Sequence, residues 1–233
     1  MRRARLLAIC LTAALATGSA AAASALAAPP EFVHLAAPLT LTGFTGKSVG
    51  VATIADTTTG AIYKCSSETL EGEIEFGSRK HVEEVVIKFK GCSGEVEKTG
   101  KIEKKCSIKS PGQPAGTLKT KRLDGNLISV APAEAPDEVG LDLLPEIGTV
   151  VMIIEAPGCA LPAAVIEGSI IGEVAPTGPP ETTTKTLLST TLGTAQKIQH
   201  LPSGAKDTLS AALAEVTLKS TVTLKFGEVM EVT

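Results

Sequence analysis

Residues 82–106 read VEEVVIKFKGCSGEVEKTGKIEKKC, and this stretch decides the fold of the chain. In its first half every second residue is apolar, namely Val85, Ile87 and Phe89. A period of two is typical of a β-strand with one buried face, so we expect a central strand here. The strand is predicted to end at Gly91-Cys92, and a polar, lysine-rich loop then leads to Cys106.

The segment before the central strand has the same period. Apolar residues alternate with three glutamates, Glu71, Glu73 and Glu75. The sequence Gly77-Ser78-Arg79-Lys80 predicts the turn that joins the two strands. Antiparallel pairing could set the glutamates opposite Lys88 and Lys90, which would give a solvated face with favourable cross-strand charges.

Further strands are predicted along the rest of the chain. The segments are 118–123, 127–130, 139–143, 150–154, 165–174, 187–192, 216–218 and 221–226. Asp124-Gly125 predicts a tight hairpin turn between the first two of these. Residues 206–216 fit a helix capped by Asp207 or, equally, an edge strand. Many short strands with Gly and Pro between them predict an all-β fold, an antiparallel β-sandwich or β-barrel with two disulfides.

The first 27 residues have the pattern of a secretory signal peptide. Three arginines precede the apolar core 6–16, and Ala25-Leu26-Ala27 fits a cleavage site. We therefore expect residues 28–233 to form a single exported β-rich domain, secreted or at the cell surface, with a candidate seam at 176–186. No later segment has the length and apolarity of a transmembrane helix.

Cleavage of the signal leaves four cysteines, Cys65, Cys92, Cys106 and Cys159. An even number of cysteines in an exported chain predicts two disulfides, of which three connectivities exist. We favour Cys92–Cys106, which would close the loop after the central strand and stabilise the fold by about 3 kcal/mol, together with Cys65–Cys159. A metal site is disfavoured because no C-x-x-C pair is present, and no cofactor is expected.

The charges are unevenly distributed along the chain. Without the signal peptide 19 basic and 25 acidic residues remain, a net charge of about −6, which disfavours nucleic-acid binding by the surface as a whole. Residues 98–122 nevertheless hold eight basic residues and one acid, Glu103. The two interpretations are a solubilising surface and a contact with an anionic envelope polymer or lipid surface. The candidate contact residues are Lys98, Lys101, Lys104, Lys105 and Lys109.

The order of these features resembles a group of secreted actinobacterial proteins that are known mostly from genome sequences and have no assigned activity. The matching segments are Ile62–Cys65, Val85–Cys92 with its F-x-G-C ending, Gly116–Leu127, Val139–Leu143, Val165–Gly172 with its G-S-I-I-G, and Thr221–Val232. The resemblance implies export and an all-β fold. It implies no activity and no site residues.

No motif in the chain predicts catalysis. The histidines His34, His81 and His200 are scattered, and no G-x-S-x-G elbow accompanies them. Carbohydrate binding by stacking is disfavoured because the chain has no Trp and one Tyr. The sequence therefore favours a non-catalytic structural or interaction module at or beyond the cell envelope. The alternatives are a β-barrel that carries a small apolar ligand, lined by 151–154 and 165–166, and, more weakly, a secreted hydrolase.

Overall fold

We analysed a computed structural model of the chain, which describes residues 30–34, 42–56, 59–75, 77–98, 101–129, 139–159, 161, 163–175, 178–181, 185–189, 209–212, 214–227 and 230–232. The described part is all-β, as the sequence predicts, and contains two disulfides. The predicted signal peptide, residues 176–177 and 182–184 of the candidate seam, and His200 lie outside the described residues.

The first half of the chain supplies the strands Phe32–His34 (β1), Thr42–Ser48 (β2), Ala52–Asp56 (β3), Ala61–Ile74 (β4), His81–Lys98 (β5), Lys101–Ser107 (β6), Thr117–Lys119 (β7) and Leu123–Ser129 (β8). The second half supplies Val139–Pro145 (β9), Val150–Ile154 (β10), Ala164–Gly168 (β11), Ile170–Ala175 (β12), Gly178–Glu181 (β13), Lys185–Ser189 (β14), Leu209–Ala211 (β15), Ala214–Lys219 (β16), Thr221–Phe226 (β17) and Met230–Val232 (β18).

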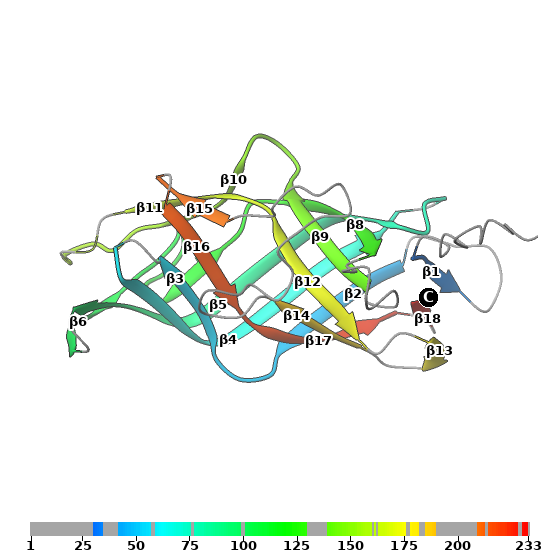
Figure 1. Cartoon of the computed structure of the whole chain (residues 1–233), viewed down its shortest axis with the longest axis horizontal. Helices are drawn as coiled ribbons and strands as arrows, with labels where there is room; N and C mark the ends of the chain where they lie inside the picture. Colours follow the sequence, from blue (N-terminus) through cyan, green and yellow to red (C-terminus); the bar gives the residue numbers. More distant parts are fainter. Residues whose placement is uncertain are drawn as a thin grey trace, which may run out of the picture.

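Most of these strands line up end to end, so the described residues form eight long antiparallel paths: β2 with β3, β4, β5, β7 with β8, β9 with β10, β11 with β12, β14 with β15, and β16 with β17. Each path pairs with the next one along the chain, and the last pairs with the first through β17–β2 and β16–β3. The long β4–β5 pairing belongs to this ring. The sheet therefore curls into a closed, up-and-down barrel, which Figure 1 shows from the side.

The barrel interior is filled with aliphatic and aromatic side chains. One cluster of buried residues reaches from Phe44 on β2 and Phe89 on β5 to Leu141 on β9 and Val222 on β17. This explains the period-two pattern of the sequence, since alternate residues of each strand point into the cluster. The central strand thus buries Val85, Ile87 and Phe89, as predicted.

The central strand does not end at Gly91-Cys92 as predicted but continues to Lys98. Gly91 has a φ of +62°, and a Cβ there would lie 2.1 Å from the Ser66 Oγ of β4. At this point the inward face changes from odd to even residues, from Phe89 to Cys92 and Gly94. The glycine therefore marks a kink that keeps both halves of β5 in the barrel wall, rather than a chain end.

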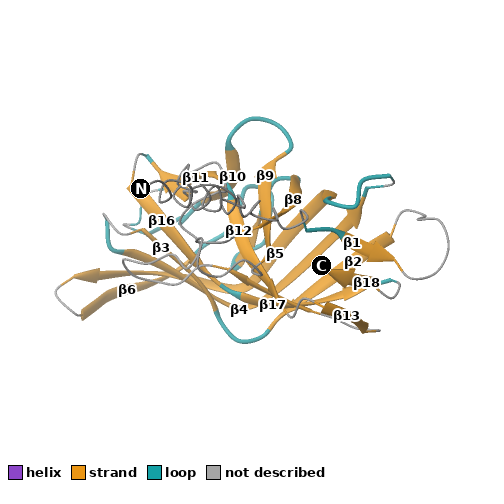
Figure 2. Cartoon of the chain, turned by 45° about the vertical axis from the view of Figure 1, so that its right-hand side comes forward, coloured by secondary structure: helices purple, strands orange, loops and turns teal. Residues whose placement is uncertain are grey.

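Different elements lie at the two ends of the barrel (Figures 1 and 2). At one end lies the small sheet β1–β18–β13, which packs the ring of Phe32 against that of Phe226 with centroids 6.1 Å apart. At the other end β5 and β6 form a hairpin arm, and Leu161 and Ile108 lie against Gly94. No helix in the described part of the chain has the length and apolarity needed to cross a bilayer.

All four predicted cysteines are paired, but the favoured connectivity is wrong. The disulfides are Cys65–Cys92 and Cys106–Cys159. Cys65 and Cys92 lie directly opposite each other on β4 and β5, with Cα atoms 4.0 Å apart. Because β5 continues to Lys98, Cys106 returns opposite Gly94 and bonds to Cys159 in the β10–β11 connection.

Two further local predictions change in the structure. Asp124-Gly125 is not a hairpin turn, because both residues lie within β8 and pair with β9. Residues 209–211 and 214–219 are strands, so the strand alternative for 206–216 holds, although β15 lies inside the sheet between β11 and β16 rather than at its edge. The turn at residues 77–80 and the strands at 150–154 and 221–226 are confirmed.

Candidate anion-binding surface

Four lysines lie together on the outer wall of the barrel. Lys88 and Lys90 belong to β5, Lys119 ends β7, and Lys121 follows it; we call this group the lysine face. Lys88 is half-buried and the other three are exposed. In the β5–β7 pairing, Lys88 stands directly opposite Lys119.

The inward neighbours of these lysines fix their direction. Ile87, Phe89 and Leu118 alternate with them and are buried in the barrel core. Thr120, also buried, ties the two paths together: its amide donates to the Ile87 carbonyl at 3.0 Å, and its Oγ1 accepts from the Ile87 amide at 3.0 Å. Since strand residues alternate in direction, burial of this row forces the lysines outward.

The predicted neutralisation of Lys88 and Lys90 by glutamates of β4 is wrong. The register sets Lys88 opposite Thr69 and Lys90 opposite Ser67. Glu71 lies opposite Val86, and Glu73 lies opposite Glu83 because a bulge shifts the register between them. Within the part of the chain that the structure describes, no ion pair involves any member of the lysine face.

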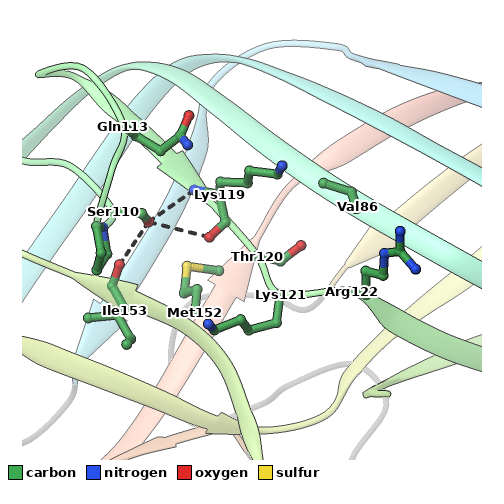
Figure 3. Close-up of a pocket in the computed structure, with 10 residues that line it drawn as sticks. Val86, Ser110, Gln113, Lys119, Thr120, Lys121, Arg122, Met152 and Ile153 are labelled. Carbon is green, nitrogen blue, oxygen red and sulfur yellow. Dashed lines mark hydrogen bonds between the residues drawn. The ribbon is translucent and has the colours of Figure 1, made fainter. Parts of the chain in front are cut away.

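A cavity of about 370 Å³ opens beside the lysine face (Figure 3). It lies between β5, the turn after β6, the β7–β8 junction and β10. The lining residues are Val86, Ser110, Pro111, Gln113, Lys119, Thr120, Lys121, Arg122, Met152 and Ile153. The cavity thus combines basic and polar groups with an apolar surface.

Ser110 holds the turn against the barrel. Its Oγ donates to the carbonyl of Ile153 at 2.7 Å and accepts from the Lys119 amide at 3.0 Å, and it also lies 3.3 Å from the Lys119 carbonyl (Figure 3). The hydroxyl is therefore committed to the backbone. Its role is to position the turn and β7 rather than to react.

Arg122 completes the basic rim of the cavity. Its Nη1 donates to Glu84 Oε1 at 2.9 Å, and both side chains are more than half exposed. Glu84 has a φ of 55° at the point where the β5–β8 register shifts. The ion pair therefore lies at an irregular point of the β5–β8 pairing.

The candidate contact lysines predicted from the sequence lie mainly on the hairpin arm. Lys98 pairs with Lys101 near its tip, and Lys104 lies on β6; their side chains are outside the described set. Lys105 is exposed, whereas Lys109 lies 3.8 Å from Glu155. The arm and the lysine face are thus separate basic regions that share β5.

The two histidines in the described part of the chain lie on different strands. His34 lies on β1, and His81, at the start of β5, contacts Asn126 Oδ1 at 3.2 Å and Glu75 at 3.9 Å. Among the described residues no group of three or more His, Cys, Asp or Glu side chains is arranged to hold a metal ion.

The apolar residues proposed to line a carrier cavity divide between two faces. Val151, Met152, Ile154 and Ile166 belong to the buried cluster, whereas Ile153 is only partly buried and Val165 is 42% exposed. Ile153 lines the cavity beside the lysine face, and Met152 reaches the same cavity from the buried cluster. The aliphatic run thus contributes mainly to the filled core.

The sequence predicts that Lys88 and Lys90 lie on a solvated face, and it does not single out Lys119, Lys121 or Arg122 as contact residues. A usable signal was present, because Lys119 and Lys121 alternate with Leu118 and Thr120 in the pattern of Lys88 and Lys90. What the sequence lacked was the register that brings the two rows together. Comparisons with protein-family models, with curated proteins and with solved structures found no match to this chain.

Proposed function

We propose that this protein is a non-catalytic, secreted interaction module that binds an anionic polymer at or beyond the cell envelope. The observation that carries the proposal is the lysine face, in which Lys88 and Lys119 stand in register without an acidic partner in the described part of the chain. The two disulfides are compatible with an extracellular location.

Like charges placed directly opposite on neighbouring strands destabilise a sheet. The repulsion between Lys88 and Lys119 therefore lowers the free energy of unfolding of the unbound protein. A bound anion between them would make their contribution to this free energy favourable. The exposed Lys90 and Lys121 extend the same charge along the two paths. A repeating polyanion matches such an extended row better than a single small ion does, because it meets several lysines at once.

The net negative charge of the protein restricts the attraction of a polyanion to the basic regions of the surface. With a net charge of about −6 after signal cleavage, the protein as a whole repels anions. Binding of a polyanion would then depend on the lysine face, with the hairpin arm as a second basic contact. Screening by salt should weaken it strongly, because the lysines are at the surface.

The test measures binding of the oxidised, full mature protein to immobilised poly(glycerol phosphate) and to polyglutamate at low and high ionic strength. Two double variants, Lys88→Gln/Lys119→Gln and Lys90→Gln/Lys121→Gln, each remove two positive charges from the lysine face. We expect each to weaken binding about tenfold, or about 0.7 kcal/mol for each lysine, at low ionic strength.

The matched control is Lys47→Gln/Lys225→Gln, which removes the same charge from exposed positions on β2 and β17. It should leave the affinity within about twofold, since only the net charge changes. Equal losses in the control and in the lysine-face variants, or no binding by the wild type at low ionic strength, would contradict the proposal.

A further inference from the structure

We propose that the cavity beside the lysine face is a binding site for one organic phosphate monoester group, carried either by a free small molecule or by a polymer. The inference rests on the proposed function in that Lys119 and Lys121 belong to both sites. It adds a specific pocket and a specific ligand class, a phosphate ester, to a surface that otherwise attracts any polyanion.

The charge on the rim favours a phosphate over a carboxylate. Lys119 and Lys121 line the cavity and have no ion-pair partner among the described residues, whereas Arg122 is already paired with Glu84 at 2.9 Å. Two uncompensated cations remain. A phosphate monoester carries up to two negative charges at neutral pH, so one such group can satisfy both lysines.

A polar donor is available beside the lysines. The Gln113 side chain lines the cavity and makes no hydrogen bond within the described part of the chain, although its backbone amide donates to the Ser110 carbonyl at 3.0 Å. Its carboxamide can therefore turn toward a bound oxygen. Ser110 cannot take this role, because its hydroxyl already serves the backbone of Lys119 and Ile153.

The cavity also has an apolar part, and its volume is too large for a bare ion. Val86 on β5 and Ile153 on β10 are partly buried and give carbon atoms for an organic body to pack against. A volume of about 370 Å³ is within the range of small-molecule sites and equals that of roughly a dozen waters. The ligand is therefore expected to place its phosphate at the rim and its carbon skeleton against these side chains.

The test titrates the oxidised mature protein with glycerol 3-phosphate, glycerate, inorganic phosphate and glycerol, followed by backbone amide NMR shifts. We expect glycerol 3-phosphate to shift amides at Gln113, Lys121 and Ile153 and to bind most tightly. Amide shifts spread over Lys47 and Lys225 as well, or equal binding of glycerol 3-phosphate, glycerate and inorganic phosphate, would overturn the pocket.

Two variants separate charge from shape. Lys121→Gln should weaken glycerol 3-phosphate about fivefold, the effect of one exposed ion pair. Val86→Phe keeps every charge and fills the cavity, so it should abolish binding of the small ester but leave polyglutamate binding unchanged. A Val86→Phe protein that binds the ester as the wild type does would overturn the pocket.

These outcomes keep the two proposals apart. If both polymers bind through the lysine face but the small ester does not bind, the proposed function stands and the pocket fails. If the ester binds in the cavity but neither polymer binds, the pocket stands and the proposed function fails. If Val86→Phe does not fold, the amide shifts of the wild type and the Lys121→Gln affinity decide the matter.

Discussion

Glu68 is a carboxylic acid enclosed within the barrel wall. Its side chain is 3% exposed, and its carboxylate accepts a hydrogen bond from Ser220 Oγ of the β16–β17 path. Burial raises the pKa of Glu68 from 4.5 to about 7, against the lowering effect of Ser220.

The raised pKa of Glu68 predicts that the free energy of unfolding is larger near pH 4.5 than near pH 7. In this range the unfolded chain has lost the Glu68 proton and the folded protein keeps it, so the free energy of unfolding falls as the pH rises through the window. The full effect is about 3 kcal/mol, and it levels off above pH 7. Urea denaturation of wild type and Glu68→Gln at several pH values checks it.

Glu68→Gln keeps a partner for Ser220 and cannot ionise, so its stability should be nearly flat across the window and should exceed that of the wild type at pH 8. Glu71→Gln, at an exposed position on the same strand, is the control and should retain the wild-type slope. A wild-type stability that rises from pH 5 to 7, with no difference in Glu68→Gln, would refute the assignment.

Gly125 shows how a reliable turn signal can be overridden. A Cβ at this position would lie 2.6 Å from the Asp142 carbonyl oxygen and 2.6 Å from Leu143 Cδ2 of β9. The glycine is therefore needed for close strand approach and not for a turn. Nothing in a single sequence distinguishes these two reasons for a glycine after an aspartate.

Gly125→Ala is predicted to destabilise the protein by about 1–3 kcal/mol, because backbone atoms of β8 and β9 must separate. Gly43→Ala on β2 is the matched control: the nearest atom to its Cβ, the Gly72 carbonyl oxygen, is 4.0 Å away. The control should change the stability by much less. Equal midpoints of urea denaturation for the two variants would contradict the prediction, because they would show that β8 and β9 can separate without loss of stability.

At the scale of elements, the sequence predicts which segments are strands better than where each strand ends. The apolar alternation identified β5, and the unbroken apolar run at 150–154 identified β10, because the apolar pattern of a strand is a local property. The sequence pattern places the end of β5 at Gly91, because a glycine that kinks a strand cannot be told from a glycine that ends one by residue type alone. This error in the end of β5 explains the wrong disulfide pairing. A strand that ends at Cys92 would let Cys106 return to it, whereas β5 continues and brings Cys106 opposite Gly94.

The candidate site fails to emerge from the sequence for the same reason. The lysines of β5 and β7 are separated by the whole hairpin arm, and their register depends on how far that arm extends. Residue type and direction were predictable for Lys88 and Lys90, whereas their partners were not. Only the structure gives the register, and with it the observation that no acid of the described residues stands opposite these lysines.

At the scale of the whole molecule, the two ends of the barrel are held in different ways. Both disulfides lie toward the end that carries the hairpin arm, and Cys106–Cys159 joins β6 to the β10–β11 connection across 53 residues. The other end is covered by the small sheet, through the packing of Phe32 and Phe44 against Phe226. Reduction of the disulfides should therefore loosen the end of the barrel that carries the hairpin arm before it affects the other end.

We predict that Cys106→Ser/Cys159→Ser lowers the free energy of unfolding by about 4 kcal/mol, since the bond closes a long loop in the unfolded chain. Because β6 has no other covalent tie, hydrogen exchange should quicken most at the β6 amides and remain slow at Phe226. Cys65→Ser/Cys92→Ser is the comparison: its cysteines are already held by the β4–β5 pairing, so the arm should keep its protection. Exchange that quickens equally at both ends would mean that the barrel opens as one unit, and that Cys106–Cys159 stabilises the whole wall rather than the arm.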